Sequence, residues 1–198
     1  MAYVEVAELK SYLGIQSNAD DALLSDICEE AQAMVDNITN RTFEAHQDST
    51  RYFNALDIRY GGRVDAFQNT LLLDFDLCQL TRVTNGNNQI IPTDALVLLP
   101  TNFVPSYAIK IKMNTSYVWT YVGTPDTAIS VVGRWAYSVN CPTPIRAATR
   151  RLAGYMYRAK DNTNETDRSM ISADGVALAA PQIPTDVMRT LEPYRRLS

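Results

Sequence analysis

Cysteine, histidine and long apolar runs are scarce in this chain of 198 residues. The three cysteines, Cys28, Cys78 and Cys141, are far apart and match neither a disulfide framework nor a zinc-binding spacing. We therefore expect buried, reduced thiols. The one histidine, His46, lies in a polar loop with no motif around it, so a Ser–His or Cys–His nucleophilic pair is not indicated.

Targeting and membrane-spanning segments are also lacking. Glu5, Glu8 and Lys10 interrupt the apolar positions of residues 1–15, which argues against a signal peptide. No apolar run approaches the roughly 18 residues needed to cross a bilayer. We expect a soluble protein that is made in a cytoplasm and does not enter a membrane.

Phosphate-binding glycine loops of the GxGxxG or Walker type are missing, so nucleotide binding has no support. Asp74 and Asp76 would place two carboxylates on one face of a strand, as a metal or acid–base site requires. Because no histidine or third acid lies nearby in sequence, we expect a solvated strand end instead. We predict no catalytic residue, no metal ligand and no cofactor.

Charge is present but unevenly spread within the net charge of -4. Residues 1–50 hold ten acids and two bases, a net charge of -8, and residues 51–140 carry +1. Residues 141–198 hold six acids and nine bases, a net charge of +3. Opposite charges favour either packing between like subunits or pairing of two faces of one subunit, and charge alone does not choose. The acidic total argues against a dedicated duplex-DNA-binding protein.

Helical periodicity is strongest near the N-terminus. It predicts one helix over residues 6–13, ended by Gly14, and a second that Asn18 caps and that fades near residues 40–42. The apolar face of the second helix is expected to comprise Leu23, Leu24, Ile27, Cys28, Ala31, Met34, Val35 and Ile38. Its other face is acidic, with Asp26, Glu29, Glu30 and Asp36.

Helical periodicity returns at the C-terminal end. A third helix is predicted from Pro144 to about Lys160, with Thr143 as its cap, and a short fourth over residues 184–194. The third helix has a basic face with Arg146, Arg150, Arg151, Arg158 and Lys160. We expect this face to contact acidic protein surfaces rather than DNA. The fourth should turn Val187, Met188 and Leu191 inward, and residues 161–182 should be mobile or ordered only by a partner.

Short runs of β-branched and aromatic residues fill residues 50–140, and Asn85 to Asn88 form a predicted hairpin turn between two of them. The predicted fold class is α+β. Both chain ends, residues 1–49 and 141–198, form one helical bundle, and residues 50–140 form an inserted small antiparallel β domain. Within this β domain, the sequence predicts a strand over residues 117–121 and a loop at Gly61–Gly62.

This order of elements resembles that of tailed-phage head–tail connector proteins, also called adaptor or head-completion proteins. The two opening helices of that family are similar to VAELKSYLGI and ADDALLSDICEEAQAMVDNITNRTF. Its passage from a strand into the third helix is similar to AISVVGRWAYS followed by PTPIRAATRRLAGYMYR. The longer members, which carry a β-rich insertion, end in a segment similar to IPTDVMRTLEPYRRL. The resemblance covers nearly the whole chain through many positions rather than one diagnostic motif.

The resemblance implies a non-enzymatic virion protein of the phage neck, between capsid and tail, made in the host cytoplasm. Such connectors form a ring, usually a dodecamer, beneath the portal protein and offer a platform to the next neck or tail protein. DNA would pass through the lumen without specific binding. The C-terminal segment would reach the portal, and deleting residues 184–198 should spare the fold. The expected subunit and portal contacts are Asp26, Glu29, Glu30, Arg146, Arg150, Arg151, Tyr155, Arg158, Tyr194, Arg195 and Arg196.

Other functions stay open at this point. The chain could be another neck or tail-completion protein at a different level of the particle. It could also be a binding module whose β domain recognises a carbohydrate or a host protein. That module would need an exposed aromatic platform, for which Trp119, Tyr121 and Trp135 are candidates, although core packing is their commoner use. A hydrolase that uses Asp74 and Asp76 is the least favoured.

Overall fold

The computed structural model describes residues 3–55, 69–159, 170–171, 177–178 and 183–196. The chain divides into two compact units. Residues 1–41 and 141–198 form a helical unit, and residues 42–140 form a β unit. The predicted α+β class, a helical part with an inserted antiparallel β part, is confirmed. The sequence pattern placed the first boundary at residue 50, whereas residues 42–48 belong to the β unit, where the Tyr137 amide donates to the Thr42 carbonyl at 2.8 Å.

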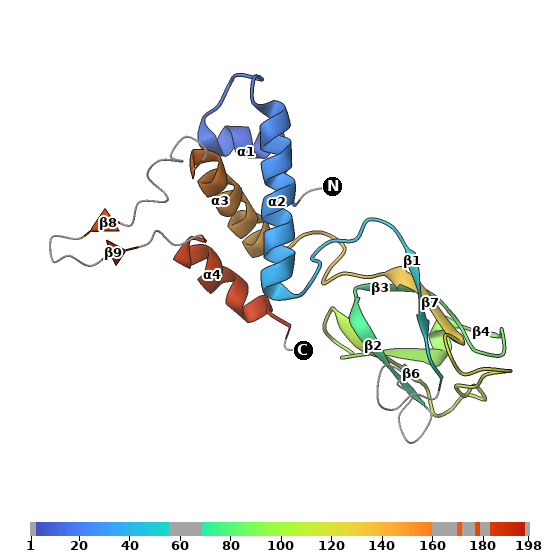
Figure 1. The fold of residues 1–198 in the computed structure, drawn as a ribbon. Coiled ribbons are helices and arrows are strands. Elements are labelled where there is room, and N and C mark those ends of the chain that lie inside the picture. Colours follow the sequence, from blue (N-terminus) through green and yellow to red (C-terminus); the bar gives the residue numbers. More distant parts are fainter. Residues whose placement is uncertain (1–2, 56–68, 160–169, 172–176, 179–182, 197–198) are drawn as a thin grey trace. The chain divides into compact units, whose positions relative to one another are not determined.

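The described part of the helical unit contains α1 (Val6–Leu13), α2 (Asp21–Thr39), α3 (Thr143–Ala159) and α4 (Thr185–Leu191) (Figure 1). A 3-10 turn, η3 (Glu192–Tyr194), follows α4. The short strands β8 (Met170–Ile171) and β9 (Ala177–Leu178) pair antiparallel. Most of residues 161–182, for which we predicted mobility, lies outside the described residues.

The ends of α1 and α2 follow from local backbone chemistry. Gly14 adopts a left-handed conformation (φ 75°) and ends α1, as predicted, and Asn40 does the same for α2 (φ 52°). The predicted cap of α2 is wrong, because the helix starts after Asp20 and Asn18 is two residues further out. The Asn18 side chain instead accepts a hydrogen bond from Lys10 Nζ at 2.6 Å.

Four helices contribute to the core of the helical unit. The buried apolar residues on these helices are Leu9, Leu24, Ile27, Cys28, Ala31, Val35, Ile145, Ala148, Leu152, Ala153, Val187 and Leu191. Val187 and Leu191 of α4 are fully buried, so deletion of residues 184–198 would remove part of this core, and we expect it to destabilise the helical unit rather than spare the fold. The inward orientation predicted for Leu23 and Met188 is wrong, since they are 39% and 38% exposed. The apolar faces predicted from periodicity therefore include residues that the other helices do not cover.

The described part of the β unit contains two antiparallel sheets. The first has the strand order β1 (Ser49–Phe53), β7 (Ile129–Arg134), β3 (Gln79–Thr84) and β4 (Ile90–Ile91). The second has the order β2 (Thr70–Leu77), β6 (Ser106–Ile111) and β5 (Leu96–Leu99), and the short 3-10 helix η1 (Thr93–Ala95) precedes β5. One hydrophobic cluster takes residues from both sheets, among them Leu71, Ile109, Val83, Ile129 and Val131. The β unit therefore has a core of its own.

The predicted hairpin turn at residues 85–88 is confirmed, because it joins the paired strands β3 and β4. The strand predicted over residues 117–121 is not formed, and only Tyr121 makes a single bridge, with Gly86. A Cβ on Gly86 would lie 2.5 Å from the Thr120 carbonyl oxygen, so the loop approaches the turn too closely for a side chain there. The predicted loop at Gly61–Gly62 lies outside the described residues.

Candidate assembly surfaces

The basic side chains of α3 are partly used within the chain itself. Glu8 of α1 accepts hydrogen bonds from Arg146 Nε at 3.0 Å and from Arg150 Nη1 at 2.9 Å. The Arg150 guanidinium also lies over the Tyr12 ring, 5.1 Å from its centroid. One carboxylate thus binds two successive turns of α3, which fixes α1 against that helix.

A second internal ion pair joins α3 to α4. Arg151 Nη1 donates to Asp186 Oδ2 at 2.8 Å, and both side chains are more than half exposed. Of the two arrangements that the charges left open, pairing within one subunit therefore holds for Arg146, Arg150 and Arg151. Their partners are on α1 and α4, not on the acidic face of α2.

Three acids of α2 remain on the surface. Asp26, Glu29 and Glu30 are exposed and lie within about one turn of each other. Among the described residues, none of them takes part in an ion pair. We call these three residues the acidic stripe. Their charge is available to a partner.

Asp36 does not belong to that stripe, although we predicted it on the same face. It is half-buried, and its Oδ1 accepts a hydrogen bond from the Tyr3 hydroxyl at 2.6 Å. The Tyr3 amide donates to Gln32 Oε1 at 2.8 Å, so residue 3 is held against α2 at two points. Burial raises the pKa of Asp36 to about 6, although the hydrogen bond from Tyr3 acts in the opposite direction.

The remaining predicted contact residues lie at the ends of α3 and η3. Arg158 and Arg195 are exposed, and neither forms an ion pair within the described part of the chain. Tyr155, Tyr194 and Arg196 are partly buried, and the Arg196 amide donates to the Thr39 carbonyl at 2.8 Å. The structure brings the C-terminal residues to the end of α2, a proximity that sequence spacing did not reveal.

The residues considered for catalysis lie on different segments of the β unit. His46 is about half exposed, and its Nε2 lies 3.2 Å from Glu44 Oε1. Asp74 and Asp76 are partly buried on β2, and no cluster of three possible metal ligands occurs in the described residues. No helix in that part of the chain is long and apolar enough to span a membrane.

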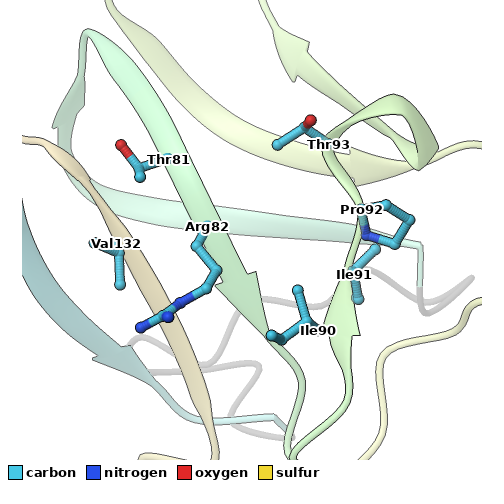
Figure 2. A pocket seen from close by; sticks show the side chains of 7 residues that line it. All are labelled: Thr81, Arg82, Ile90, Ile91, Pro92, Thr93 and Val132. Atoms are coloured by element: carbon cyan, nitrogen blue, oxygen red, sulfur yellow. The ribbon is translucent and has the colours of Figure 1, made fainter.

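An open hollow of about 540 Å³ lies on the β unit. Figure 2 shows its lining side chains coming from β3, from β7 and from the segment that runs from β4 to η1. The lining consists of Thr81, Arg82, Ile90, Ile91, Pro92, Thr93 and Val132. These residues include no carboxylate, imidazole or thiol, so the hollow contains no general base.

The aromatic platform considered for a binding module is not on the surface. Trp119 and Trp135 are 4% and 6% exposed and belong to the core of the β unit, and Tyr121 packs against it. Trp135 Nε1 donates to the Ser49 carbonyl at 3.0 Å. The two tryptophan rings are therefore core residues and not available to a ligand, and Tyr121 is partly buried.

No protein-family model and no curated protein matches this chain. Among solved structures, its fold matches chains of gene transfer agent (GTA) particles. A chain from the neck of an empty GTA particle, computed with C6 symmetry, has a TM-score of 0.57 at 17% identity, covering 99% of this chain and 91% of that chain. A chain from the neck of a native GTA particle, computed with C12 symmetry, has a TM-score of 0.57 at 15% identity, covering 98% and 88%. A chain from the virion of a native GTA particle has a TM-score of 0.55 at 16% identity, covering 99% and 91%.

Proposed function

We propose that this chain is a structural protein in the neck of a tailed phage or phage-like particle. The observation that carries the proposal is the match of the whole chain, helical unit and β unit together, to chains of GTA necks. A match to one unit alone would support only a common fold element, because single domains recur in proteins of many functions. At identities of 15–17%, the structural match establishes the fold alone, and the neck location is our inference from that fold.

Within the neck, the chain acts as a head–tail connector that forms a ring, with twelve copies as the expected number. Support comes from the neck structures computed with C12 and C6 symmetry. The helical unit forms the body of the ring. The ion pairs of Glu8 with Arg146 and Arg150 keep α1 and α3 in one arrangement, so that each copy presents the same surfaces to its neighbours.

The ring is positioned beneath the portal protein, and the C-terminal residues Tyr194, Arg195 and Arg196 contact that protein. The exposed Arg195 and the resemblance to the C-terminus of connectors support this assignment. The other side of the ring receives the next neck or tail protein. DNA passes through the lumen without specific binding, as the net charge of -4 favours. This role requires neither catalysis nor a cofactor.

Deletion of the coding sequence from the genome that encodes the protein tests the role. We expect filled heads and free tails that do not join, visible by electron microscopy, and their joining to return when the wild-type chain is supplied. Supply of the Ile27→Asp variant, which places a charge in the core of the helical unit, should not restore joining. Intact particles in the deletion strain would contradict the proposal.

A further inference from the structure

Two helices of the helical unit expose an apolar residue that helical periodicity assigns to the core. Leu23 on α2 is 39% exposed and Met188 on α4 is 38% exposed. Each lies beside uncompensated charge, Leu23 beside the acidic stripe and Met188 beside Arg189. An apolar side chain surrounded by charge is a common composition for a contact surface.

The acidic side of this unit is the outer face of α2. Leu23, Asp26 and Glu30 follow one another at spacings of three and four residues, which places them in one row along the helix. Glu29 lies beside that row, and all four residues are exposed. No described ion pair neutralises the carboxylates of Asp26, Glu29 and Glu30, so this side carries a charge of -3 near one leucine.

The basic side is formed by α3 and α4. Arg158 lies two turns beyond Arg151 on the same face of α3, and Arg151 marks the border with α4 through its ion pair with Asp186. Arg189 is exposed on α4 and, like Arg158, has no ion pair within the described residues. Glu192, which follows α4, is an exposed acid. The three arginines of this side still outnumber its two acids, Asp186 and Glu192, so its net charge is positive.

The acidic side lies on α2, whereas the basic side lies on α3 and α4, so the two sides are different surfaces of the helical unit. α3 packs against both α2 and α4, so the exposed faces of α2 and α4 are those turned away from it. Figure 1 shows α2 and α4 as separate helices that both lie against α3. A contact between two different patches of identical chains is heterologous, and repetition of such a contact closes a ring when its rotation permits.

We infer that the acidic side of one copy binds the basic side of the next, with Leu23 and Met188 covered in the contact. This inference rests on the proposed ring and specifies how it is built. The partner is a second copy of this chain, because each side carries one exposed apolar residue and a net charge opposite to that of the other side. A closed ring repeats the contact at each subunit, so a modest pair interaction suffices for a stable ring.

Charge reversal tests the contact through two variants that complement each other. The first, Asp26→Arg with Glu30→Arg, makes the acidic side positive, and the second, Arg158→Glu with Arg189→Glu, makes the basic side negative. Each variant alone should assemble only at concentrations at least about tenfold above those of the wild type, because like charges then meet. An equimolar mixture should form rings in which the two variants alternate. Light scattering gives the assembly state, and native mass spectrometry gives the composition.

Asp94→Arg and Arg82→Glu in the β unit are controls for each sign of charge reversal, although each changes the net charge by half as much as a double variant does, and both should assemble as the wild type does. Circular dichroism checks that every variant keeps its helices. Wild-type rings that neither double variant weakens would overturn the contact and leave the proposed function standing. Rings that persist in the second variant while portal attachment is lost would assign α4 to the portal instead. A wild type that stays monomeric at every concentration and on the portal would contradict the ring and the contact together.

Discussion

The helical unit and the β unit differ in what joins residues that are distant in sequence. In the helical unit, ion pairs between helices add to the apolar core: Glu8 binds Arg146 and Arg150 across 138 and 142 positions, and Arg151 binds Asp186. In the β unit, paired strands and one apolar cluster connect the chain, and both tryptophans of the protein lie in that cluster. The helical unit therefore uses charge for its own structure and still leaves charge on its surface.

The β unit places its main polar network inside. Asn85 is 2% exposed, and its Oδ1 accepts from the amides of Gly86 and Thr120, each at 3.0 Å. Its Nδ2 donates to the Val118 carbonyl at 2.8 Å. This side chain attaches the loop before β7 to the β3–β4 turn, where sequence pattern had indicated a strand. The helical unit therefore provides the surfaces proposed for assembly, whereas the β unit has an apolar core of its own and is expected to fold independently.

The largest expected effect comes from placing a charge in one core at a time. In Ile27→Asp, a buried unpaired carboxylate should cost the helical unit about 4 kcal/mol or more and unfold it. The β unit should stay folded because its core is separate. Helical circular dichroism follows one unit, and tryptophan fluorescence follows the other, because Trp119 and Trp135 are both in the β unit.

The matched variant Ile129→Asp should do the reverse, with loss of the tryptophan signal of a folded core and retention of the helical signal. If either substitution abolished both signals together, the two units would depend on each other for folding. Independent folding of the helical unit and the β unit would then be excluded.

A medium effect is expected for Asn85→Ala. The substitution leaves two amides and one carbonyl of the loop without their partner, which should cost the β unit about 2–4 kcal/mol. Urea unfolding followed by tryptophan fluorescence should show a lower midpoint, with the helical transition unchanged. Asn87→Ala, an exposed position of the same turn, is the control and should shift the midpoint little. Equal shifts in the two variants would contradict the role given to Asn85.

The smallest expected effect is a pH dependence confined to the helical unit. The pKa of Asp36 is raised to about 6, so the native state binds its proton more tightly than the unfolded state does, whose pKa is near 3.8. Stability from this group is therefore present below pH 3.8 and is lost as the pH rises to about 6. Asp36→Asn, which can still accept from Tyr3, should stabilise the helical unit at pH 7 by about 1 kcal/mol after allowance for solvent screening and change little at pH 3.5.

Urea titrations at the two pH values, followed by helical circular dichroism, measure this difference. Asp26→Asn serves as the control, since Asp26 is exposed and has no described ion pair. A gain for Asp36→Asn that is the same at both pH values would exclude titration of this carboxylate as its cause.

Local signals in the sequence predicted the helices well. The helical period together with Gly14 gave both ends of α1, and β-branched runs with a turn between them gave the β3–β4 hairpin. Such features depend on residues within a few positions of each other, so spacing along the chain contains the information. The α+β class followed from the same signals.

Contacts between distant residues were not predictable in this way. No spacing rule pairs Glu8 with Arg146 and Arg150, and the basic face of α3 was therefore assigned to a partner as a whole. Periodicity identified Leu23 and Met188 as apolar positions but not whether another helix of the same chain would cover them. The loop around Trp119 was misassigned because its aromatic and β-branched composition suits a strand, whereas its geometry depends on Asn85.

The mass of the purified protein in solution tests the central claim most directly. Mass photometry of the full chain, over a range of concentrations and with portal protein present or absent, should detect a discrete closed species. Without portal protein, a ring of twelve copies of 22.1 kDa has a mass of about 265 kDa. A single species at 22.1 kDa under every one of these conditions would contradict a ring-forming neck protein.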